Sequence, residues 1–197
     1  MIEIASPYVP NAATPQPVEY GAVLRASHGG KAQQLIRPGS RFRARVSWPP
    51  MKPDAARILL SRLLAALDTG VRIIWPLIGV NQGVSGAPVV DGAGQTGTTI
   101  AIRGLTAGAV VKEGYWISLI DGAGQHYLHN ARADRVASGG GLISLPIFPA
   151  LRASFADGAS VLISQPKFEG LIIDAFSWDI TIEKVIEGIS LIIEEAA

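Results

Sequence analysis

Three stretches in the middle of the chain decide the fold: VVDGAGQTGTTIAIRG (89–104), EGYWISLIDGAGQHYLHNARADRV (113–136) and GGGLISLPIFPALRASFADGASVLISQP (139–166). Each joins short runs of β-branched and aromatic residues through glycine-rich turns, which is typical of antiparallel strands. We expect strands at 98–103, 115–120, 125–132, 141–145 and 160–164, with a hairpin turn at Gly122-Ala123-Gly124. Short strands of this kind predict a small, closed or nearly closed barrel of OB- or SH3-like type.

Upstream of this segment, residues 41–48 (RFRARVSW) alternate strictly between polar and apolar side chains. Period two predicts a half-buried strand. Its polar face carries Arg41, Arg43 and Arg45. These arginines either bind an acidic partner, line a polar channel or face solvent. Weaker strand signals lie at 20–25 and 32–37.

Residues 53–67 form the clearest helix pattern. Pro53 suits a first helical turn, Asp54 complements the helix dipole, and Gly70 is a natural cap. A buried strand is expected at 71–77, where Pro76 places the strand at a sheet edge or ends it. The expected apolar stripe of the helix contains Ala56, Leu59, Leu60, Leu63, Leu64 and Leu67.

After Pro166, residues 178–183 alternate again, and residues 188–194 favour a last strand, although 184–193 also fits a short helix. The N-terminal part has too few strands to close a sheet alone, so we expect the C-terminal strands to return to it. The predicted fold is mainly β. Residues 1–85 and 167–197 form a β-sandwich or split-barrel-like domain with one helix (53–67), and residues 86–166 form a small inserted barrel. Residues 79–88 are expected to be the linker into that barrel.

The composition narrows the function classes. The chain has 197 residues with 17 basic and 16 acidic side chains, which argues against a large nucleic-acid footprint. The 22 glycines and 13 prolines suit a turn-rich β protein, and the absence of cysteine excludes disulfides and thiolate chemistry. We expect neither a signal peptide nor a membrane anchor. The mean hydropathy of +0.31 favours a subunit interface.

The glycine-rich pentapeptide DGAGQ occurs at 91–95 and again at 121–125, which indicates either two similar turns or a repeat. A phosphate-binding loop needs a helix after it, whereas both copies here precede predicted strands. We therefore expect no nucleotide site.

Other catalytic and metal-binding patterns are weak. His126 and His129 lie three residues apart on a predicted strand, so their side chains point to opposite faces and are expected to be partly exposed. His28 is remote in sequence. No serine lies in a nucleophile elbow, and Asp174 and Asp179 are expected to flank packed aromatic residues. We predict no catalytic, cofactor-binding or metal-binding residues, and no enzymatic activity.

The order of several segments resembles one family of phage proteins. The relevant stretches are VVDGAGQTGTTIAIRGL, GYWISL, GQHYLHNARADRVA and LPIFPALRASFADGASVLISQP, preceded by the strand that ends at Trp48, the helix and the strand that ends at Pro76-Leu77. Over roughly residues 40–180 this order is similar to that of siphophage distal tail proteins. The resemblance implies a β domain bearing one helix, an inserted OB-like barrel and no catalytic residues.

The same resemblance implies a structural virion protein at the distal end of the tail, made in the host cytoplasm. Its partners would be further copies of itself in a ring of six, the tail tube protein and the tail-tip hub protein. Tape-measure or fibre proteins are further candidates, and DNA would be only transient cargo. Because a lumen that passes DNA should not be strongly basic, the resemblance also implies that Arg41, Arg43 and Arg45 face another subunit or solvent. The alternatives are another minor tail or hub protein and a carbohydrate- or cell-surface-binding module. Exposure of Tyr115, Trp116 and Tyr127 would favour sugar binding, and their burial would favour the ring subunit.

Overall fold

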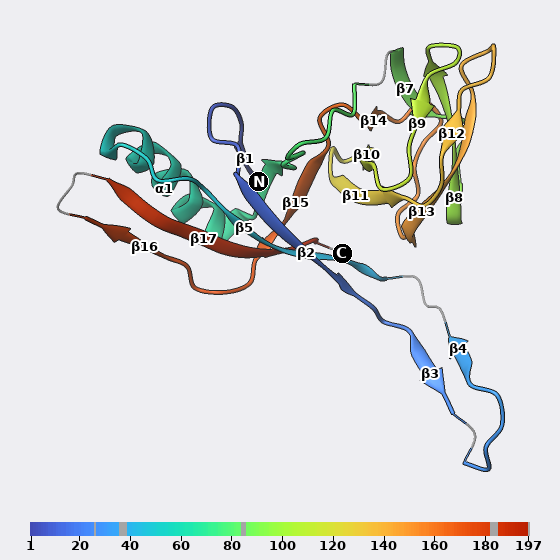
Figure 1. Cartoon of the computed structure of the whole chain (residues 1–197), viewed down its shortest axis with the longest axis horizontal. Helices are drawn as coiled ribbons and strands as arrows, with labels where there is room; N and C mark the ends of the chain where they lie inside the picture. The colour runs from blue at the N-terminus through green and yellow to red at the C-terminus, as the bar shows by residue number, and fades with distance from the viewer. Residues whose placement is uncertain (26, 36–38, 84–85, 182–184, 197) are drawn as a thin grey trace.

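The computed structural model describes residues 1–25, 27–35, 39–83, 86–181 and 185–196. Two large sheets dominate these residues, one with seven strands and one with six. Figure 1 shows them as two bodies joined side by side, with a narrow two-stranded arm that projects away from both. The expected mainly β fold with one helix and a small barrel is confirmed.

The seven-stranded sheet combines strands from both ends of the chain. Its order is β1 (Ile2–Ile4), β6 (Val71–Ile74), β15 (Lys167–Ile172), β17 (Ile186–Glu194), β5 (Arg41–Ser47) and β2 (Ala12–Val18), with β16 (Ser177–Ile180) paired to β17. The chain leaves this sheet after β6 and returns to it at β15, and β15 pairs with β6 while β17 pairs with β5. The division into a domain of residues 1–85 and 167–197 and a separately folding domain of residues 86–166 stays a prediction.

Helix α1 (Pro53–Thr69) covers the β1, β6 and β15 side of this sheet. Leu59 and Leu63 are fully buried, but Leu64 and Leu67 are 47% and 48% exposed, so the expected apolar stripe was wrong for these two leucines. Helix α1 packs only against β1, β6 and β15, so the stripe of buried residues along the helix is narrower than the predicted apolar stripe. Ala66 completes it instead.

The predicted boundaries of α1 and β6 hold to within a few residues. Gly70 ends the helix with a φ of 82°, and its N–H donates to the Ala66 carbonyl at 2.7 Å. Few residues other than glycine tolerate this φ. Strand β6 stops at Ile74 rather than Leu77, since Pro76 cannot donate to a ladder.

The six-stranded sheet curls into a nearly closed barrel with its own hydrophobic core. A β-bridge between Val89 and Ser160 brings its two end strands together. Residues 86–90 form a strand, so the linker predicted at 79–88 was wrong over its last residues. The strand order is β14 (Val161–Leu162), β10 (Trp116–Ile120), β11 (His126–Ala131), β13 (Ile143–Leu151), β8 (Gly97–Leu105) and β7 (Gly86–Val90), beside the short pair β9 (Val110–Val111) and β12 (Arg135–Val136).

The remaining strands settle two sequence predictions. Residues 186–194 are a strand, so the alternative helix at 184–193 was wrong. The weak signals near the N-terminus become β3 (Ala22–Leu24) and β4 (Gln33–Leu35), which pair with each other and form the arm. Parts of the strands predicted at 32–37 and 178–183 lie outside the described residues.

The contrast between Leu63 and Leu64 gives a direct test of the helix packing. Leu63→Ala should lower the free energy of unfolding by about 3 kcal/mol, because it leaves a cavity in the core beneath α1. Leu64→Ala, one residue away, should change it by less than about 0.5 kcal/mol. Urea denaturation of both variants measures the difference, and equal losses would contradict the described orientation of α1.

Candidate functional site

The joint between the two sheets is the region where β10 and β11 of the barrel meet β15 of the seven-stranded sheet, and aromatic side chains fill its centre. Trp116 at the start of β10 packs 5.2 Å from Phe42 and 5.0 Å from Trp75, measured between ring centroids. Phe148 lies 5.7 Å from Phe42, and Phe168 lies 5.4 Å from Trp75. Trp116 and Phe148 thus extend from the barrel into the core of the neighbouring sheet. Three of these four pairs are edge-to-face, and such pairs add about 0.5–1.5 kcal/mol each beyond simple burial.

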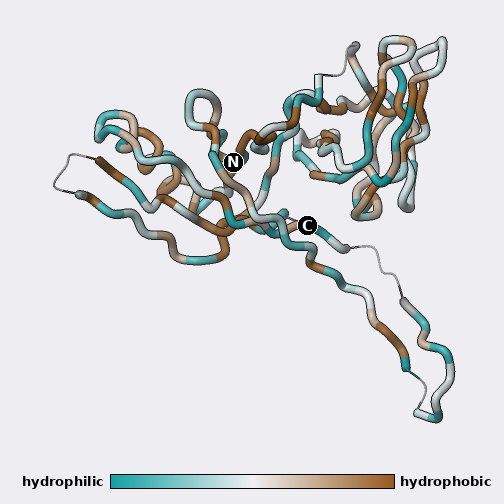
Figure 2. The backbone as a smooth tube through the Cα atoms, viewed as in Figure 1, coloured by the Kyte–Doolittle hydropathy of each residue, from teal (hydrophilic) through white to brown (hydrophobic). Residues whose placement is uncertain are grey.

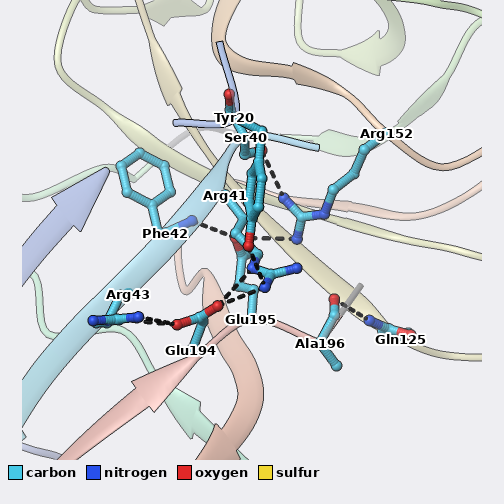
Figure 3. Close-up of polar contacts among 10 residues, drawn as sticks. All are labelled: Tyr20, Ser40, Arg41, Phe42, Arg43, Gln125, Arg152, Glu194, Glu195 and Ala196. Atoms are coloured by element: carbon cyan, nitrogen blue, oxygen red, sulfur yellow. Dashed lines mark hydrogen bonds and ion pairs between the residues drawn. The ribbon is translucent and has the colours of Figure 1, made fainter. Parts of the chain in front are cut away.

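A buried carboxylate connects the backbones of the two sheets (Figure 3). Glu195, 2% exposed, follows directly after β17. Its side chain accepts hydrogen bonds from the N–H of Phe42 in β5, at 2.9 Å, and from the N–H of Leu128 in the barrel, at 2.7 Å. One side chain therefore fixes the position of β11 relative to β5.

Arg152 supplies the opposite charge. Its Nη2 lies 3.0 Å from Glu195 Oε2, and its guanidinium stacks 5.0 Å from the ring centre of Tyr127. The Nη1 group also donates to the Ser40 carbonyl at 3.4 Å. Burial raises the pKa of the Glu195 carboxyl, and Arg152 and the two amides oppose that shift. Removing either charge would leave the other buried without a partner.

A second buried carboxylate links the sheets on the side of β6. Glu169 of β15 accepts from Arg72 Nε at 2.5 Å and from the N–H of His126 at 3.3 Å. Arg72 also donates to the carbonyl of Gly124, in the turn before β11, at 2.6 Å. Both members of this pair thus bond to the barrel backbone.

A third polar contact lies in the connection that enters the barrel. The Gln82 side chain is 1% exposed and donates to the carbonyls of Trp116 and Ile163, both at 2.7 Å. Its Oε1 accepts the Trp116 N–H at 2.8 Å. This part of the predicted linker is therefore anchored to the barrel rather than a loose tether.

The arginines singled out from the sequence have a partner within the chain. Arg41 and Arg43 both bind Glu194 on the adjacent strand, at 2.6 Å and 2.5 Å, while Arg45 stays exposed. The expectation that all three face another subunit or solvent stays a prediction, and the Arg43 side chain keeps 39% exposure beside its ion pair. What that expectation missed is the partner Glu194, which lies beside these arginines because β17 pairs directly with β5. Burial raises the pKa of the Glu194 carboxyl, but the hydrogen bonds from Arg43 and Arg41 outweigh this and hold it below its ordinary value.

The histidine pair differs from expectation. His126 and His129 are both buried, not partly exposed, because both faces of β11 are covered. His129 Nδ1 lies 2.9 Å from the Pro149 carbonyl. Burial lowers the pKa of His126 to about 4 and that of His129 to about 3, so both are neutral near pH 7. Within the described ranges, no group of three or more potential ligands could hold a metal ion.

The two DGAGQ segments are turns with different internal contacts. Gln95 folds back onto the Asp91 and Ala101 carbonyls in the first. In the second, Asp121 accepts from the N–H groups of Ala123 and Gln125. Strand β8 follows the first copy and β11 the second, so neither precedes a helix N-terminus that could bind phosphate.

The aromatic residues considered for sugar binding do not form a shared surface. Trp116 lies in the aromatic centre of the joint, Tyr127 is buried in the barrel, and Tyr115 is half-buried with its hydroxyl 3.3 Å from the Asn81 carbonyl. Asp174 and Asp179 are exposed, and they flank the aromatic pair Phe176 and Trp178, whose ring centroids lie 5.9 Å apart.

Searches against protein-family models and against curated proteins found no match for this chain. No helix in the described part of the chain is long and apolar enough to cross a membrane. In the joint, the charged groups bind backbone amides, backbone carbonyls and one another, so they hold the two sheets together.

The sequence reasoning missed the charged residues that build the joint. Arg72 in VRII and Glu169 in KFEGL are isolated charges between apolar strand residues, and this pattern could have marked them as a buried pair. Glu195 and Arg152 gave no such signal. Arg152 directly follows β13 and Glu195 directly follows β17, 43 positions later in the sequence. Only the tertiary fold brings the two residues together.

The Glu195 contacts predict a large and selective effect on stability. Glu195→Ala should cost about 3–5 kcal/mol, because it leaves Arg152 buried without its counter-charge and two amides without acceptors. Glu187→Ala, at an exposed position of the same strand, should cost less than about 0.5 kcal/mol. Chemical denaturation measures both, and a loss below about 1 kcal/mol for Glu195→Ala would show that the carboxylate does not hold the joint.

The buried histidines predict a dependence of stability on pH. Their pKa values fall from 6.5 in the unfolded chain to about 4 and about 3 in the folded chain, so the unfolded state binds protons that the folded state excludes. Their stabilising effect is therefore complete above pH 6.5 and declines as the pH falls toward 4. The free energy of unfolding should drop by up to about 1.4 kcal/mol per pH unit for each histidine.

Denaturation curves between about pH 7 and 5 test this slope, since most carboxylates stay ionised there. The double variant His126→Gln/His129→Gln should flatten the slope, and His28→Gln, at an exposed position, should leave it unchanged. A double variant with the wild-type slope would contradict the assignment.

Proposed function

We propose that this chain is a structural subunit of the tail tip of a long-tailed phage, of the distal-tail class, which forms a ring between the tail tube and the hub. The observation that carries the proposal is the order of elements. A strand, a helix and a second strand precede a barrel, and further strands then return to the first sheet. This is the arrangement that the resemblance to distal tail proteins implies.

The joint supports the role of a rigid wall subunit. A wall subunit must hold its parts in a fixed orientation while force passes through it. Here an aromatic cluster and the buried groups Glu195, Glu169 and Gln82 connect the sheets. Sliding one sheet against the other would leave buried polar groups without partners, at a cost of about 1–3 kcal/mol each and more for charges.

The surface supports self-assembly. Apolar side chains remain exposed on α1 (Leu64, Leu67), on the arm (Val23, Leu24) and at β16 (Ile180), which agrees with the positive mean hydropathy of +0.31. Apolar surface on separate flanks of one subunit is suited to contacts with several neighbours. Tyr127 is buried and Trp116 is half-buried in the joint, so neither ring gives the carbohydrate-binding alternative support.

Imaging of tails tests the proposal. Electron cryomicroscopy of purified tails that carry an affinity tag on this chain should place it in one closed ring between tube and hub, with the six copies that the resemblance implies. A tag density on peripheral fibres, a single copy at the tip or no tag in the tails would refute the proposal. A position inside the hub would favour the alternative of another minor tail protein.

A further inference from the structure

We propose that the arm of one copy binds the acidic hairpin of the next copy. The arm comprises the described residues from 20 to 35, which contain β3 and β4. The acidic hairpin comprises the described residues from 174 to 190, which contain β16 and the start of β17. The inference rests on the proposed ring and identifies the contact that would close it.

The arm has apolar side chains that no described residue of the same copy covers. Strands β3 and β4 pair only with each other among the described residues. Val23 and Leu24 are neighbours on opposite faces of β3, yet they are 58% and 55% exposed. Figure 2 shows this apolar stretch far from both cores. A two-stranded ribbon is marginally stable in water alone, so these apolar faces indicate a surface that becomes covered.

The root of the arm is fixed although its strands are not covered. Tyr20 accepts a hydrogen bond from Arg41 Nη2 at 2.8 Å, and the Arg41 guanidinium lies 5.2 Å from the centre of the Tyr20 ring. Glu194 holds the same guanidinium (Figure 3). The arm thus leaves the sheet in a defined direction, which lowers the entropy lost when it binds.

The charges of the arm and the acidic hairpin are complementary. Arg25 and Lys31 are exposed on the arm, and neither forms an ion pair with a described residue. On the hairpin, Asp179 lies directly opposite Glu187 in the β16–β17 ladder, and both are exposed. Like charges in this position destabilise a sheet unless a cation lies beside them. No described residue supplies that cation.

The acidic hairpin also offers an open sheet edge and apolar contact. Strand β16 has β17 on one side and no described strand on the other. Ile180 on β16 is 77% exposed. An incoming ribbon could therefore combine main-chain hydrogen bonds with apolar and ionic contacts, as in other cases of strand addition.

The two surfaces lie at opposite ends of the molecule. The arm leaves β2 and β5 at the end of the sheet where the barrel packs, and the β16–β17 hairpin lies at the far end (Figure 1). A contact between two different surfaces of identical copies is heterologous, and it produces a ring when the rotation closes. This contact would give every copy one donor end and one acceptor end.

Charge reversal tests the pairing. Arg25→Glu/Lys31→Glu on the arm, or Asp179→Lys/Glu187→Lys on the hairpin, should each weaken association by at least about tenfold, since charges that attract would then repel. Combining all four substitutions should restore association. Asp68→Lys/Glu113→Lys, which reverses two exposed acids elsewhere, is the matched control and should associate like wild type. Sedimentation velocity over a range of concentrations gives the measurement, with circular dichroism to verify folding.

A mixing experiment tests the head-to-tail geometry. A chain whose residues 22–35 are replaced by a short Gly-Ser turn keeps its hairpin but lacks the arm, and the Asp179→Lys/Glu187→Lys chain keeps only its arm. Together they should form a dimer with one copy of each and grow no further. An arm-shortened chain that assembles like wild type would overturn the inference.

The outcomes separate this inference from the proposed function. If the wild-type chain forms rings and all these variants associate as strongly as wild type, the inference is overturned and the proposed function is unaffected. A wild-type chain that stays monomeric at every concentration would also overturn the inference, while the location of the chain in imaged tails decides the proposed function independently.

Discussion

The buried carboxylate of Glu195 is the constraint on which the rest of the structure depends. It binds the backbone N–H of Phe42 in one sheet and that of Leu128 in the other, and Arg152 balances its charge. Burying this group is tolerable only while all three partners stay in place. The aromatic rings around Trp116 fill the space beside it, and Glu169 with Arg72 repeats the same arrangement on β15 and β6. The two sheets therefore behave as one body.

Because the joint is fixed, the two elements that extend from the sheet, the arm and the acidic hairpin, have defined positions relative to each other. The arm and the acidic hairpin extend from opposite ends of the seven-stranded sheet (Figure 1). Because Arg41 contacts both Tyr20 of the arm and Glu194 of β17, the direction of the arm is tied to the sheet near the Glu195 contacts. In this account the core fixes the angle between neighbouring copies, and the exposed surfaces provide the adhesion.

Local patterns predicted much of the fold. The alternation in residues 41–48, the helix that starts at Pro53 and the glycine-rich hairpin at residues 122–124 all describe contacts between near neighbours in sequence. Strands β7 and β15 were missed because Gly86-Ala87-Pro88 and the lone Glu169 obscure their patterns. Within the joint, the isolated charges Arg72 and Glu169 left a readable signal, but Glu195 and Arg152 did not, since they pair only through the tertiary fold. The same is true of Arg41 and Arg43, whose partner Glu194 is set by strand pairing alone.

Hydrogen exchange, compared between the free and the assembled chain, tests the central claim most directly. In the free chain, the amides of Phe42 and Leu128 should exchange as slowly as the core, while those of Ala22–Leu24 in the arm should exchange quickly. Assembly should protect the arm and β16 and leave the joint unchanged. Fast exchange at Phe42 and Leu128 in the free chain, or an arm that remains unprotected after assembly, would contradict the account of a rigid subunit joined through its arm.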